Sequence, residues 1–153
     1  MTESKKYPNN LRLITENMPS LLSVSVGILV GAGSCLETKN INGISHFIEH
    51  VTFKGTKRFS STGLSEAFDD IGAQVNAFTS KEMTCYYVKS TKKQLERSVE
   101  LLSDMFLNSV YDDEELSREK GVVIEEINMS YDTPEDVCLD ALSQAFYGDE
   151  GLG

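Results

Sequence analysis

The spacing of apolar residues along this chain changes from alternation to helical recurrence, and this change constrains the fold class. Residues 11–16 alternate between apolar and polar side chains, as a half-buried strand does. Residues 21–31 are rich in β-branched and other apolar side chains and predict a central strand. The stretches AQVNAFTS and MTCYYVKS also alternate and flank a short polar turn, so they predict a hairpin.

Helical spacing is clearest in residues 44–53. Apolar side chains recur there at i, i+3, i+4 and i+7, which predicts an amphipathic helix. Further helices are predicted at about 62–71, 91–108, 112–131 and 135–147. This order of elements indicates an α+β fold, in which helices cover one face of a meander-like, largely antiparallel sheet.

The composition excludes several classes of protein. The length of 153 residues suits one domain over residues 1–153, and a hydrophobic content of 40% is enough to build a core. The net charge of −10 argues against nucleic acid as a partner, because phosphate binding requires a surplus of Lys and Arg. The most apolar run, residues 23–33, is too short to span a bilayer, so no membrane partner is expected.

The cysteines and the two ends of the chain suggest its cellular context. Cys35, Cys85 and Cys138 are odd in number and lack CxxC spacing, which is typical of reduced thiols. The polar start MTESKKYPNN contains no apolar segment like that of a signal peptide. A cytoplasmic location is therefore expected.

The final residues YGDEGLG resemble a loop in mid-passage, so we expect the chain to be the front part of a longer protein.

Both histidines of the chain lie in the predicted helix 44–53. His46 and His50 are four residues apart, so both imidazoles can face one metal ion from the same side of the helix. Glu49 borders that face and can hold a water without being a ligand itself. A chance pair of packed histidines remains the alternative, although the order HxxEH is that of the inverted zinc peptidases.

A catalytic zinc needs a third protein ligand, which must here be a cysteine or a carboxylate. In the predicted helix 112–131, Glu119 and Glu126 are seven residues apart and lie on one side, with valines between them. Glu126 is thus an acid in an apolar helix face, which requires a partner. Glu125 is rotated by about 100° and is expected in solvent. The alternative for Glu119 is an exposed acid that balances Arg118 or Lys120.

An ordered set of longer stretches resembles the pitrilysin-type zinc peptidases with an inverted HxxEH motif, in particular their processing-peptidase-like members. The matching stretches are GAGSCLE, GISHFIEHVTFKGTKR, IGAQVNAFTSKEMTCYY, EKGVVIEEI and DTPEDV. Together they cover most of the chain from about residue 10 onward. The resemblance implies the N-terminal part of a zinc metalloendopeptidase that hydrolyses unfolded peptides or presequences.

Site residues follow from this resemblance one by one. It implies that His46, His50 and Glu126 bind one Zn²⁺, with Glu126 lying 76 residues after His50. It implies that Glu49 is the general base and that Glu119 supports the site.

The resemblance also places a substrate-binding strand at NAFTS. Asn76, Ala77 and Phe78 are then expected to contact an extended peptide by β-augmentation. The alternative for Phe78 is packing in the core, which is also the role expected for Tyr86 and Tyr87.

Three interpretations of the function remain at this point, and the first is the zinc metalloendopeptidase that the resemblance implies. Members of the pitrilysin-type family close two related domains or subunits around the peptide. The resemblance therefore implies that a C-terminal domain or partner subunit completes the site. A non-catalytic partner subunit of such an assembly is the second reading. A lyase with an HxxEH motif and a cysteine as third ligand is the third.

Overall fold

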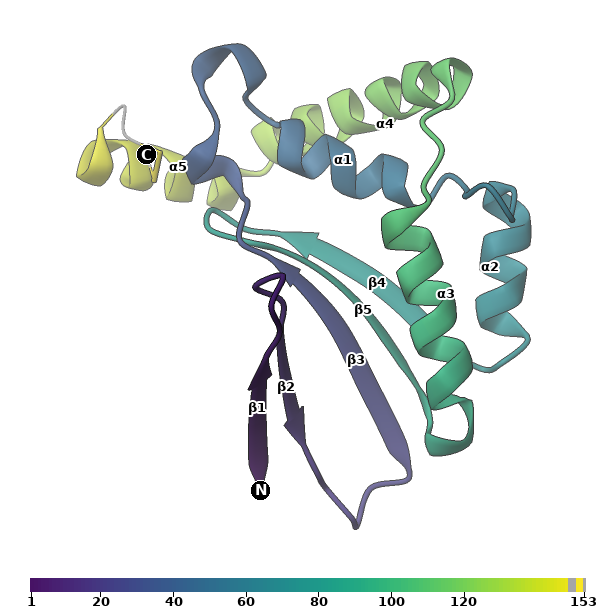
Figure 1. Cartoon of the computed structure of the whole chain (residues 1–153). Coiled ribbons are helices and arrows are strands. Elements are labelled where there is room, and N and C mark those ends of the chain that lie inside the picture. The colour runs from purple at the N-terminus through teal and green to yellow at the C-terminus, as the bar shows by residue number, and fades with distance from the viewer. Residues whose placement is uncertain (149–150, 153) are drawn as a thin grey trace.

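The arrangement of helices and strands is known from a computed structural model, which describes residues 1–148 and 151–152 (Figure 1). Residues 149, 150 and 153, which belong to the predicted C-terminal loop, lie outside the described residues. Figure 1 shows helices gathered over one face of a curved sheet, with a narrow strand pair projecting beside it. The predicted α+β class is confirmed.

The strands form two antiparallel sheets. A two-stranded ribbon pairs β1 (Thr2–Lys6) with β2 (Arg12–Glu16). A three-stranded sheet has the order β3 (Ser23–Val30), β5 (Thr84–Thr91), β4 (Gln74–Thr79).

Two predictions about the sheet are wrong. The strand within residues 21–31 is β3, which lies at an edge, and β5 occupies the centre. The sheet is also not a meander, because β3 pairs with β5 and not with β4, the next strand along the chain. The physical reason is burial. Most residues of β5 are buried, whereas every second residue of β3 is exposed.

The helices lie close to the ranges predicted from the sequence. Side-chain and proline signals mark two starts: the Ser60 hydroxyl accepts a hydrogen bond from the Gly63 N–H at 3.1 Å, and Pro134 begins the last helix. The α-helices of the described chain are α1 (Ile44–Thr52), α2 (Ser61–Asp69), α3 (Leu95–Leu107), α4 (Asp113–Tyr131) and α5 (Pro134–Tyr147).

The core lies between the three-stranded sheet and the helices α2 and α3. Val88 of β5 stands opposite Val26 of β3 and Val75 of β4, and its side chain is almost fully buried beneath the helices. The core side chains with the least exposure are Leu64, Phe68, Val88, Leu101, Leu102 and Met105.

Helix α1 lies between the sheet and α4. It contacts β4 and β5 on one side, and α4 packs against its other side (Figure 1). The two histidines and the acids of α4 therefore meet in the contact between α1 and α4.

Candidate metal centre

The helix that carries the HxxEH residues is capped by an acid from the preceding loop. Gly43 precedes α1 with φ 86° and has no side chain that could cap the helix. The Glu37 carboxylate accepts the N–H groups of Gly43 at 2.6 Å and of Ser45 at 2.8 Å. A negative charge at this end also complements the helix dipole. Glu37 therefore fixes where α1 starts.

We expect Glu37→Ala to lower the free energy of unfolding by about 1 kcal/mol, the usual cost of losing a helix cap. For a chain of this length, the melting temperature should fall by roughly 2–4 °C. Thermal unfolding followed by circular dichroism measures this effect. Glu82→Ala, which removes an exposed acid from the β4–β5 turn, is the matched control. Equal melting temperatures for the two variants would contradict the capping role.

The same cap is expected to be pH-dependent. Burial raises the pKa of Glu37, but hydrogen bonds from Ser45 and Gly43 together with the nearby His46 outweigh it, so the pKa lies below its usual value of 4.5. The cap therefore stabilises the fold above about pH 4.5, and this contribution is lost as the pH falls through the lower pKa of the folded chain. The difference in melting temperature between wild type and Glu37→Ala should shrink in acid.

Three potential ligand atoms meet where α1 packs on α4. The Nε2 atoms of His46 and His50 are 3.2 Å apart. Glu126 Oε2 lies 3.7 Å from the first of these nitrogens and 3.3 Å from the second. Two ligands bound to zinc at its usual bond lengths and tetrahedral angle are separated by roughly 3.3 Å. The triangle formed by His46 Nε2, His50 Nε2 and Glu126 Oε2 therefore matches a tetrahedral zinc site with one position left for water.

The ring of His50 is oriented by Glu119. Glu119 Oε2 lies 3.3 Å from Nδ1 of His50, opposite the nitrogen that faces Glu126. A hydrogen bond from Nδ1–H leaves the Nε2 lone pair available to a metal. The Glu119 side chain is only 4% exposed, and its other oxygen lies 2.7 Å from Lys54 Nζ. The alternative of an exposed acid is therefore wrong, and Arg118 pairs with Glu115 instead.

Glu126 is less enclosed than the sequence predicts. Its side chain is 40% exposed, and the neighbouring Val122 is 41% exposed, so this part of α4 is not buried among the described residues. The partners that Glu126 was expected to need are the two histidines. Glu125 is exposed, as its rotation around the helix predicts.

Glu49 faces the sheet side of the site. The Thr79 hydroxyl, at the end of β4, donates a hydrogen bond to Glu49 Oε2. Thr79 also lies 3.5 Å from the Thr84 hydroxyl, which donates to the Ala32 carbonyl at 2.9 Å. Each hydroxyl has a single proton. Because Thr79 donates its proton to Glu49 and Thr84 donates its own to Ala32, neither hydroxyl has a second proton to donate. The carboxylate is thereby held by one oxygen.

The predicted substrate strand is β4. Among the described residues, no strand pairs with its outer edge. Asn76 is exposed, and its Oδ1 accepts the Ala77 N–H at 2.8 Å, while Ala77 itself is half-buried. Phe78 is 48% exposed and its ring lies 6.5 Å from that of Tyr87, so the core alternative for Phe78 is wrong.

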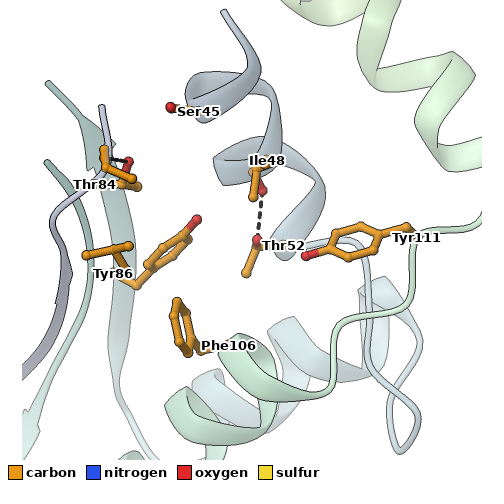
Figure 2. Close-up of a pocket in the computed structure, with 9 residues that line it drawn as sticks. Ser45, Ile48, Thr52, Thr84, Tyr86, Phe106 and Tyr111 are labelled. Carbon is orange, nitrogen blue, oxygen red and sulfur yellow. Dashed lines mark hydrogen bonds between the residues drawn. The ribbon is translucent and has the colours of Figure 1, made fainter. Parts of the chain in front are cut away.

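A separate cavity of about 280 Å³ opens on the other side of α1. Figure 2 shows Ser45, Ile48 and Thr52 of α1 facing Tyr86 and Phe106 across it. Tyr86 is buried, as predicted for a core residue, and this burial raises the pKa of its hydroxyl. The lining residues are apolar or carry hydroxyl groups, so the cavity is distinct from the metal centre.

Comparison with known proteins identifies the family. Residues 12–153 match the sequence model described as Insulinase (Peptidase family M16). The chain belongs to peptidase family M16. This M16 chain is 50% identical over 151 residues to YmxG of Bacillus subtilis, described as an uncharacterized zinc protease, and covers 37% of that protein. It is 41% identical to the mitochondrial-processing peptidase subunit beta of Saccharomyces cerevisiae, of which it covers 33%.

The M16 fold is also evident from a solved structure. A crystal structure of a peptidase M16 inactive domain from Pseudomonas fluorescens aligns with 99% of this chain and 37% of that one, with a TM-score of 0.88 at 14% identity. The chain spans about a third of the length of the curated relatives it matches. In the part of this M16 chain that the structure describes, no helix is long and apolar enough to cross a bilayer.

Three residues that support the candidate metal centre were not predicted from the sequence. Glu37, Lys54 and Thr79 all lie inside stretches that carry the family resemblance. Their place in those stretches was the only signal in the sequence, because each of the three side chains contacts a residue of a different element. Glu37 caps α1, Lys54 contacts α4, and Thr79 bonds to Glu49 across the α1–β4 contact.

Proposed function

We propose that residues 1–153 form the N-terminal zinc-binding domain of a metalloendopeptidase. The observation that supports this best is the triangle of His46, His50 and Glu126, whose ligand atoms have the separations of a tetrahedral zinc site. One Zn²⁺ per chain would be held by these three residues. When bound, it would polarise the scissile carbonyl and lower the pKa of a water molecule.

Glu49 is the proposed general base. It would take the proton from the attacking water and return it to the leaving amine. The hydrogen bond from Thr79 supports this role, because it fixes one carboxylate oxygen and so orients the other. Glu119 would support catalysis by holding the His50 ring through Nδ1.

The proposed substrates are unfolded peptides or presequences that bind in extended form. The unpaired edge of β4 in the described sheet supports this, because an extended peptide can pair with such an edge. Asn76, Ala77 and Phe78 would contact the peptide, and the exposed Phe78 ring offers a surface for an apolar side chain. A C-terminal domain or partner subunit would enclose the peptide, in a protein that we expect in the cytoplasm.

We expect Phe78→Ala to raise KM for an unstructured peptide roughly fivefold to thirtyfold, the effect of losing one buried aromatic contact in a complex. The change in kcat should be smaller, because Phe78 lies on the β4 strand and not among the ligands. Steady-state kinetics of the intact protein measure both constants. Phe146→Ala, which removes an exposed ring from α5, is the matched control. An unchanged KM would contradict the assignment of Phe78.

The proposed activity is tested in the intact protein that contains this chain. Elemental analysis should find about one zinc per chain, and an unstructured fluorogenic peptide should be cleaved. A chelator should abolish cleavage, and added zinc should restore it. Zinc binding without cleavage would favour the alternative of a non-catalytic partner subunit. Cleavage that survives complete removal of the metal would contradict the proposal.

A further inference from the structure

Glu119 is a nearly buried carboxylate that meets two basic side chains. Its side chain is 4% exposed, whereas that of Glu126, two turns further along α4, is 40% exposed. A buried negative charge is costly unless a cation and hydrogen bonds compensate it. The two carboxylate oxygens are divided: Oε1 lies 2.7 Å from Lys54 Nζ, and Oε2 lies 3.3 Å from His50 Nδ1.

Lys54 reaches this carboxylate from the end of α1. The residue directly follows the helix cap Phe53, and its backbone N–H donates to the Val51 carbonyl at 3.1 Å. Its side chain is 27% exposed, so the ammonium group is partly withdrawn from water. A cation at this end of α1 also complements the helix dipole. The neighbouring Arg58 pairs with Glu100 on α3 instead.

We propose that Lys54 is a positioning residue for the metal centre, acting through Glu119 on His50. This rests on the proposed zinc site. With Lys54 bound to one oxygen, the carboxylate cannot rotate freely, and its second oxygen stays opposite Nδ1 of His50. The ion pair also joins the end of α1 to the middle of α4. It thereby helps to hold the two histidines of α1 at the correct separation from Glu126.

Without the ammonium group, the charge of Glu119 loses its closest partner. The carboxylate is then expected to move toward water and to release the His50 ring, which would weaken the preformed ligand triangle. Outer partners of metal-bound histidines typically contribute 10- to 100-fold to metal affinity. We expect an effect of about this size from Lys54→Met.

The test measures zinc affinity and does not depend on catalytic activity. The dissociation constant is determined for this chain by competition with a chromophoric chelator at neutral pH. Lys54→Met should weaken zinc binding roughly 10- to 100-fold. Lys54→Arg keeps the charge and should restore most of the affinity. Lys57→Met removes an exposed lysine three residues away and should have no effect.

A double-mutant cycle separates this role from a general structural one. If Lys54 acts through the Glu119 charge, Lys54→Met should have little further effect on zinc affinity in a Glu119→Gln background. Full additivity of the two changes would overturn the proposal. So would a Lys54→Arg variant as weak as Lys54→Met, or equal zinc affinities for Lys54→Met and wild type.

The remaining outcomes are also informative. If Lys54→Met fails to fold by circular dichroism, Lys54 is a determinant of folding and the proposed role is wrong. If the wild-type chain has no zinc affinity, both the zinc site and the role of Lys54 are contradicted. If the wild type binds zinc and Lys54→Met binds it equally well, the zinc site stands and only the role of Lys54 fails.

Discussion

Replacing Glu126 with Gln is expected to weaken zinc binding by roughly 10²- to 10³-fold. Zinc sites with four protein ligands are worth about 10–16 kcal/mol, so a single ligand contributes roughly 2.5–4 kcal/mol. The amide of Gln has nearly the same shape as the carboxylate but lacks its charge. Glu126 Oε2 is the only carboxylate oxygen placed with the two Nε2 atoms in the cluster found among the described residues. Chelator competition measures the change.

The control for this prediction is the neighbouring acid. Glu125→Gln makes the same chemical change one residue earlier, on the exposed side of α4, and should leave zinc affinity unchanged. If Glu126→Gln retained zinc, and a cysteine substitution removed it, the ligand set would be that of the lyase alternative. The cysteines are all free, and none belongs to the ligand cluster in the described part of the chain.

Replacing Glu49 with Gln is expected to reduce kcat of the intact protein by roughly 10²- to 10⁴-fold, the range attributed to general acid–base catalysis. Zinc affinity should remain close to that of the wild type, because Glu49 is outside the ligand triangle. Gln can still accept the Thr79 hydrogen bond, so the side chain should keep its place. Peptide cleavage and zinc titration on the same preparation test both parts.

Glu66→Gln is the control for the Glu49 variant. It makes the same change at an exposed position of α2, away from the α1–α4 contact, and should not alter kcat. A Glu49→Gln protein that cleaves peptides at the wild-type rate would exclude Glu49 as the base. A protein that loses zinc together with activity would place Glu49 in the coordination sphere, contrary to the ligand set proposed for this site.

Local patterns together with the family resemblance pointed to the helices and to the three residues of the ligand cluster. The period of apolar residues located α1, and helix start and stop signals located α2 and α5, because such signals depend only on residues within one or two turns. The HxxEH order placed both histidines on one helix face for the same reason. Glu126 came from the family resemblance together with its position in an apolar stretch, and the structure brings it to the histidines.

Pairing between distant segments was predicted less well. The strand β3 is apolar enough to be central, yet β5 takes that place, because sheet order depends on which strands the helices bury. The ribbon strand β1 was missed altogether. Its sequence TESKK contains no apolar residue that could alternate with polar ones, so it is recognised as a strand only through its pairing with β2.

The sequence by itself determined that this chain carries an HxxEH helix, a distant acid and the stretches of an M16 peptidase. Only the tertiary structure decided how those residues are held. Glu119 was expected either to support the site or to lie in solvent, and packing of α4 on α1 buries it against Lys54 and His50. Glu37 caps α1 and Thr79 holds Glu49 by contacts between separate elements. Such contacts depend on the packing of whole helices and strands, which no local spacing of residues encodes.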